Sequence, residues 1–176
     1  MGRKNILTLL EGGDRRQIGR ADQVVAMVSA DPRLFPQLIA GLWSEDPLVC
    51  MRAADAAEKA TRTKPGLLKS YKRELLGLLA EAVQQELRWH LALMIPRLSL
   101  NAGERELAAS LLARYLQDHS SIVRTFALQG LAELAQDDPT IRSTVIEILR
   151  EATRNGTPAM KARSRKLLIH LQKGSV

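Results

Sequence analysis

The lysines and arginines of this sequence occur in groups, and grouped basic side chains can bind anions. The chain holds 26 Lys and Arg against 19 Asp and Glu, a formal net charge of +7. Residues 59–73 contain no acidic residue and six basic ones: Lys59, Arg62, Lys64, Lys69, Lys72 and Arg73. From Arg154 onward there are again six basic residues and no Asp or Glu. Such charge favours nucleic acid, acidic protein surfaces or anionic lipid as partners, although it can also serve solubility alone.

No pattern of residues predicts catalysis, a metal or a cofactor. The glycines of EGGD (11–14) lack the strand and the spacing of a phosphate-binding loop. Asp137 and Asp138 precede Pro139, which predicts a helix cap rather than a pair of catalytic carboxylates. Three His and one Cys, far apart in the sequence, do not form a zinc signature. The sequence therefore favours a function that is not enzymatic, while an enzymatic one stays open.

The location of the protein is predicted from its cysteine and its apolar runs. Cys50 is the single cysteine, so no internal disulfide can form and a reducing compartment fits. The apolar run ILTLL near the start is too short for a secretory signal. No apolar run approaches the ~20 residues that span a bilayer. We therefore predict a cytoplasmic protein without a membrane partner.

A short pattern recurs along the chain. An apolar anchor is followed by small or apolar residues four and seven positions later, and by apolar residues eight and eleven positions later. The copies are 49–60, 87–98, 123–134 and 160–171, with a weaker one at 17–28. Their four anchors are 38, 36 and 37 residues apart. These offsets place the residues on one helical face, and a period in the thirties is typical of stacked helical hairpins.

Turn signals and a second apolar stripe follow each copy. Asp31, Asn101 and Asp138 are predicted to cap the second helices, and Pro32 and Pro139 suit a first helical turn. No segment alternates with the period of a strand. The sequence therefore predicts an all-α fold.

The repeated pattern resembles the HEAT-repeat family. The nearest matches are DPLVCMRAADAAEKA (46–60) and DHSSIVRTFALQGLAEL (118–134), where an acidic turn leads into an apolar anchor and then small and Leu positions. The residue after the anchor is basic in three copies (Arg88, Arg124 and Lys161) but is Cys50 in the second. If that position supports a ladder of side chains between repeats, the ladder is broken or rerouted at Cys50.

The resemblance implies a right-handed α-α superhelix of about four and a half HEAT-like helical hairpins. The whole chain, 1–176, would be a single repeat domain with short tails at 1–5 and 173–176. The expected units are roughly 14–43, 44–81, 82–117, 118–153 and 154–172.

The second helices of HEAT-like stacks line the concave surface, so the resemblance also implies a row of basic residues there. Lys69, Arg105 and Arg142 stand 20, 18 and 19 residues after their anchors. Neighbouring helices lie about 8–10 Å apart, a spacing suited to successive phosphates or an acidic helix. Three acidic residues could neutralise this row instead: Glu74, Glu104 and Glu106. With Trp89 as a candidate contact residue, the predicted binding residues are Lys69, Lys72, Arg73, Arg105, Arg142 and Trp89.

Two functions follow as expectations. The first is a non-catalytic scaffold whose concave face binds a protein partner. The alternative is binding of DNA through a basic concave face, similar to the HEAT-like proteins of DNA-alkylation repair. A homodimer is a further option, because the last unit lacks a second helix and its open end needs a cover.

Overall fold

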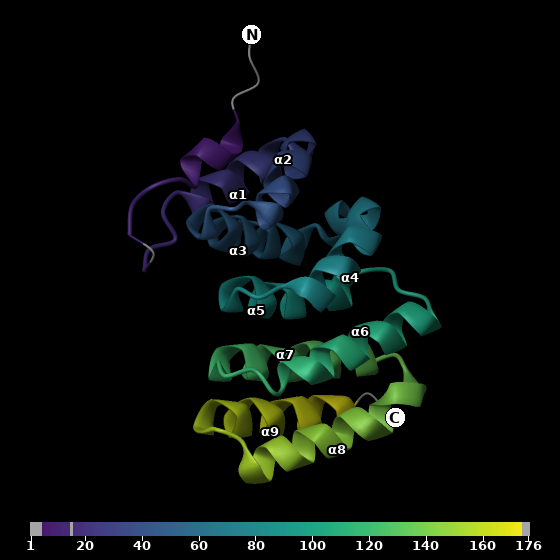
Figure 1. Ribbon diagram of the computed structural model, residues 1–176. Helices are drawn as coiled ribbons and strands as arrows, with labels where there is room; N and C mark the ends of the chain where they lie inside the picture. Colours follow the sequence, from purple (N-terminus) through teal and green to yellow (C-terminus); the bar gives the residue numbers. More distant parts are fainter. Residues whose placement is uncertain (1–4, 15, 174–176) are drawn as a thin grey trace. The chain divides into compact units, whose positions relative to one another are not determined.

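The computed structural model describes residues 5–14 and 16–173, and in them it contains helices and turns but no strand (Figure 1). The prediction of an all-α fold is confirmed. The chain divides into two compact units, the first ending at Tyr71 and the second beginning at Lys72. Each is considered by itself, and the single repeat domain over 1–176 stays a prediction. Within the described ranges, no helix combines the length and the apolar character that crossing a membrane requires.

The first unit is built around its longest helix, α3. Its elements are η1 (Ile6–Leu9), α1 (Ala21–Ala30), η2 (Pro32–Leu34), α2 (Phe35–Ala40), η3 (Gly41–Trp43), α3 (Pro47–Thr63) and η4 (Pro65–Tyr71). Helix α3 packs against α1, α2 and η3. Its N-terminus is capped by Asp46, whose carboxylate accepts a hydrogen bond from the backbone N–H of Leu48. The predicted cap Asp31 accepts from Arg33 N–H in the same way.

Alanines form the buried face of α3. Ala53, Ala56 and Ala57 have no exposed surface, and Ala60 is 2% exposed, as the repeated pattern predicted. A Cβ atom added at Gly41 would lie only 2.7 Å from the Cβ of Ala53. The small side chains therefore allow the neighbouring backbone to approach α3 closely.

Ala56→Leu is expected to lower the free energy of unfolding by ~1–3 kcal/mol, because the added carbons would overpack the fully buried surroundings of Ala56. Urea denaturation compares the variant with Ala40→Leu, a matched change at an exposed position at the end of α2. Equal midpoints for the two variants would show that Ala56 does not line a tight contact.

The second unit pairs helices in a regular order. Its elements are α4 (Lys72–Glu81), α5 (Gln85–Met94), η5 (Ile95–Arg97), α6 (Ala102–Tyr115), α7 (Ser121–Ala135), α8 (Pro139–Asn155) and α9 (Pro158–Lys173). Helix α7 packs against α5 and α9, α6 packs against α4 and α7, and α8 packs against α7 and α9 (Figure 1). The anchors Leu87, Val123 and Met160 are buried, each at the third position of its helix, α5, α7 or α9. Helical hairpins thus recur in register within this unit.

The second helices of this unit begin at the predicted caps. Asn101 and Glu104 form a reciprocal capping box at the start of α6, in which each side chain accepts from the backbone N–H of the other residue. Asp138 accepts a hydrogen bond from Thr140 N–H at the start of α8. Both predicted caps are confirmed, and they fix the residues at which α6 and α8 begin.

Candidate functional site

Two members of the predicted basic row make contacts inside the second unit. Arg105 donates from Nη1 to the Asp138 carboxylate at 3.0 Å and from Nη2 to the Leu100 carbonyl at 3.2 Å. Arg142 donates to the carbonyls of Ala135, at 3.1 Å, and Gln136. Each guanidinium therefore closes the turn before its own helix. Hydrogen bonds from Thr140 and then Arg105 hold the pKa of the Asp138 carboxyl below its ordinary value.

The lysines and the arginine around the start of α4 differ in their surroundings. Lys72 donates from Nζ to Glu104 at 2.7 Å, so this acidic residue neutralises Lys72 rather than Arg105. That hydrogen bond, together with one from Asn101 N–H, lowers the pKa of Glu104. Lys69, on η4 of the first unit, and Arg73, on α4 of the second, are exposed. Of the predicted row, the surface-exposed cation is Lys69.

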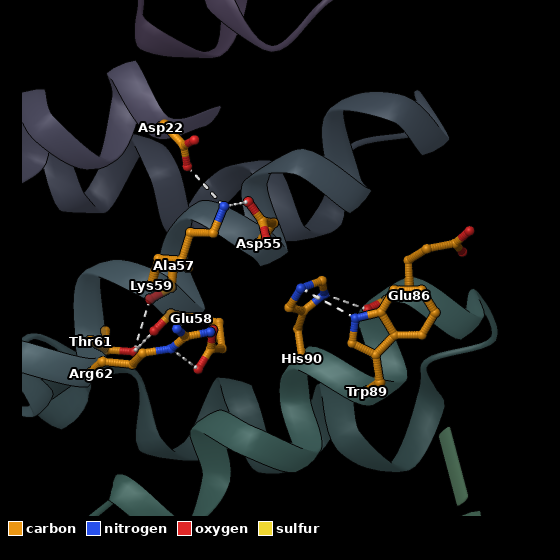
Figure 2. A network of polar contacts seen from close by, with 10 residues as sticks. All are labelled: Asp22, Asp55, Ala57, Glu58, Lys59, Thr61, Arg62, Glu86, Trp89 and His90. Atoms are coloured by element: carbon orange, nitrogen blue, oxygen red, sulfur yellow. Dashed lines mark hydrogen bonds and ion pairs between the residues drawn. The ribbon is translucent and has the colours of Figure 1, made fainter. Parts of the chain in front are cut away.

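Trp89 is half-buried on α5, where its ring faces the neighbouring histidine. Its indole Nε1 donates to His90 Nε2 at 3.2 Å, and the two ring centroids are 5.5 Å apart (Figure 2). The His90 Nδ1 atom lies 2.7 Å from the Glu86 carbonyl oxygen. The indole N–H thus has its acceptor within its own helix. Because the ring is half-buried, only part of its surface is accessible to a partner.

Part of the basic run in 59–73 is also used within the first unit. Figure 2 shows Lys59 between Asp22 and Asp55, both within 2.8 Å of its Nζ atom. Arg62 pairs with the buried carboxylate of Glu58 one turn earlier. This run therefore supplies fewer unengaged cations than its composition indicates.

A pocket around Arg124 lies within the second unit. Its volume is about 610 Å³, and it lies between the end of α6, the side of α7, the end of α8 and the start of α9. We call it the Arg124 pocket, and its lining comprises Leu116, Gln117, Arg124, Leu128, Glu147, Ile148, Glu151, Ala152, Asn155, Gly156, Thr157 and Met160.

The side chain of Arg124 has no hydrogen-bond or ion-pair partner in residues 5–14 and 16–173, and its Nε atom is buried. A buried donor without a partner costs free energy, and a guanidinium is best satisfied by a carboxylate or phosphate. The repeat pattern identified Arg124 as a basic residue directly after an anchor. Nothing in the sequence predicted that its side chain would lack a partner.

Acidic residues at the rim of the Arg124 pocket are paired with residues of their own helix. Glu147 pairs with Arg150, and Glu151 accepts from Arg154 at 2.9 Å and from Asn155 at 2.5 Å. The hydrogen bonds from Asn155 and then Arg154 lower the pKa of Glu151. The rim carboxylates thus have cationic or amide partners of their own, whereas the guanidinium of Arg124 does not.

The Arg124 pocket combines an apolar floor with one guanidinium. Leu128, Ile148, Ala152 and Met160 supply the apolar side chains. Such a pocket suits a ligand group that carries an anion next to an apolar body. No group of three or more His, Cys, Asp and Glu side chains within the described residues is arranged to hold a metal ion.

Comparisons of this chain with protein-family models, with curated proteins and with solved structures found no match.

Proposed function

We propose that this chain is a non-catalytic binding module for a protein partner, built as a right-handed superhelix of about four and a half HEAT-like hairpins. In this proposal the Arg124 pocket receives an acidic side chain of the partner. The observation that carries the proposal is the buried Nε atom of Arg124, which faces no acceptor in the described part of the chain. A carboxylate from outside would supply that acceptor and the opposite charge together.

The surroundings of Arg124 favour a protein partner over nucleic acid. The phosphate backbone needs several cations in a row, because each neutralised phosphate adds to the affinity. The lining of the Arg124 pocket contains a single cation, Arg124, together with Glu147 and Glu151, so it offers no row of cations to successive phosphates. Of the other predicted cations, Lys72, Arg105 and Arg142 are held by internal contacts.

Selection of random peptides displayed on phage tests the proposal. We expect the wild-type protein to enrich peptides that contain Asp or Glu, and Arg124→Gln to lose that enrichment. Arg165→Gln is the matched control, since it removes the same charge from an exposed arginine of α9 that does not line the Arg124 pocket. Equal enrichment by wild type and Arg124→Gln would exclude the Arg124 pocket as the binding site.

Binding of nucleic acid remains the second candidate, favoured by the net charge of +7 and by the exposed Lys69 and Arg73. It predicts binding to random duplex DNA that weakens steeply between about 50 and 200 mM salt. Lys69→Glu combined with Arg73→Glu should then weaken binding, whereas Arg33→Glu, another exposed position, should do so less. Absence of binding at low salt would leave only the protein partner.

A further inference from the structure

The Arg124 pocket has a smaller counterpart one hairpin earlier in the second unit. That counterpart has a volume of about 150 Å³, against about 610 Å³ for the Arg124 pocket. The two are lined by residues at matching repeat positions, 36 or 37 residues apart. The seven matching pairs are Leu79 and Leu116, Ala80 and Gln117, Arg88 and Arg124, Leu111 and Ile148, Arg114 and Glu151, Tyr115 and Ala152, and Asp118 and Asn155.

Two side chains fill the counterpart and satisfy its arginine. Asp118 Oδ2 lies 2.5 Å from Arg88 Nη1, and the Asp118 side chain is 1% exposed. The Tyr115 ring lies against the same guanidinium, with 5.4 Å from its Cζ atom to the ring centroid. The Tyr115 hydroxyl donates to the Leu79 carbonyl at 2.7 Å. One arginine is therefore held by a carboxylate and an aromatic ring at once.

The protonation of these two groups matches their roles. Burial raises the pKa of Tyr115 to about 12, so its hydroxyl stays a donor. Burial alone would raise the pKa of Asp118, but hydrogen bonds from Ser120 N–H and from Arg88 outweigh it and hold the pKa below its ordinary value. The carboxylate that faces Arg88 is thus an anion near neutral pH.

The Arg124 pocket lacks both groups. Ala152 stands where Tyr115 stands, so no ring covers the guanidinium. Asn155 stands where Asp118 stands, and its side-chain amide donates to Glu151 instead of pairing with Arg124. The absence of the ring leaves more open space in the Arg124 pocket, and the absence of the carboxylate leaves its arginine without a partner.

We infer that the Arg124 pocket binds a protein segment that presents an aromatic residue and, three positions later, an acidic one, as Tyr115 and Asp118 are arranged. The inference rests on the proposed function and specifies its partner. The ring would cover the guanidinium over Leu128 and Ile148, and the carboxylate would pair with Arg124. Gln117 and Glu151 at the rim are exposed, so the backbone of the segment can lie outside the pocket.

The chain itself supplies the probe for a test. A capped peptide with the sequence of residues 113–119, Ala-Arg-Tyr-Leu-Gln-Asp-His, carries both groups at the required spacing. Isothermal titration against the full chain should show binding that weakens at least about tenfold with Tyr→Ala or with Asp→Asn in the peptide. Arg124→Gln in the protein should cause a loss of the same size, and Arg165→Gln should not.

A protein variant that fills its own pocket provides an independent test. Ala152→Tyr combined with Asn155→Asp should restore the arrangement found at Arg88, raise the melting temperature and abolish peptide binding. Neither single change should both raise the melting temperature and abolish peptide binding, because the ring and the carboxylate are both needed to hold the Arg124 guanidinium. A double variant that binds the peptide as tightly as wild type would overturn the inference.

The outcomes separate this inference from the proposed function. Equal binding of the peptide and its Tyr→Ala variant would contradict the requirement for an aromatic residue. It would still agree with a partner that presents an acidic residue. Peptide binding that is unchanged by Arg124→Gln would contradict both this inference and the proposed function. Tighter binding of free 3-(4-hydroxyphenyl)propanoate than of the peptide would overturn the assignment to a protein segment, since the same chemistry would then come from a small molecule.

Discussion

Replacement of Arg52 by methionine is expected to lower the free energy of unfolding of the first unit by at least about 3 kcal/mol. Arg52 is 2% exposed on α3. Its guanidinium donates to four backbone carbonyls of the segment before α1: Leu10, Gly12, Asp14 and Gln17. Methionine would fill part of the space but remove four charge-assisted hydrogen bonds at once, and the Leu10 carbonyl, whose bond is buried, would be left without a donor at a cost of about 1–3 kcal/mol.

The first unit can be observed alone because the chain has two tryptophans, one in each unit. In a Trp89→Phe background, urea denaturation followed by Trp43 fluorescence reports the first unit. Arg33→Met is the control, since the Arg33 side chain is 82% exposed and pairs with Asp31 two residues earlier. Its unfolding midpoint should stay close to that of the Trp89→Phe parent. A midpoint for Arg52→Met equal to that of the control would show that the carbonyls find water instead.

Gly130→Ala is expected to destabilise the second unit by at least about 2 kcal/mol. A Cβ atom at this position of α7 would lie 2.4 Å from the backbone carbonyl oxygen of Ala92 on α5, and 3.0 Å from a methyl group of Leu112. The obstacle is backbone rather than a flexible side chain, so α5 and α7 must separate. The gain in helix propensity from alanine, about 1 kcal/mol, is too small to offset this.

Gly77→Ala is the matched control for that experiment. Gly77 is an exposed residue of α4, and nothing lies within 4 Å of a Cβ atom added there. The same substitution should therefore stabilise the unit by about 0.5–1 kcal/mol. Trp89 fluorescence in a Trp43→Phe background gives both values. Effects of the same sign at the two glycines would contradict the close approach of α5 and α7.

The helices, their buried faces and their caps could be predicted from the sequence, because each depends on residues close in the chain. The spacing of four, seven, eight and eleven placed Ala53, Ala56 and Ala57 on the buried face of α3. Asp31 and Asp138 cap the helices that follow them because an aspartate carboxylate reaches N–H groups two residues ahead. Both rules are local, so no knowledge of tertiary contacts was needed.

The partners of the arginines could not be predicted in this way. Arg105 reaches Asp138 across 33 residues of sequence, and Arg52 reaches Leu10 across 42. The repeat placed Arg88 and Arg124 at equal positions, yet Asp118 pairs with Arg88 and Asn155 turns to Glu151. A long side chain can reach several acceptors, and its choice depends on which distant segments the packing brings near.

The sequence by itself therefore determined that the described part of the chain is all-α, where the helical segments after Asp31, Asn101 and Asp138 begin, and which faces the repeated helices bury. Only the tertiary structure decided which cations are engaged internally and which one, Arg124, faces a pocket without a partner among the described residues. The physical reason is the range of the interactions: periodicity and capping act within one or two helical turns, whereas charge pairing and cavity volume depend on packing between helices.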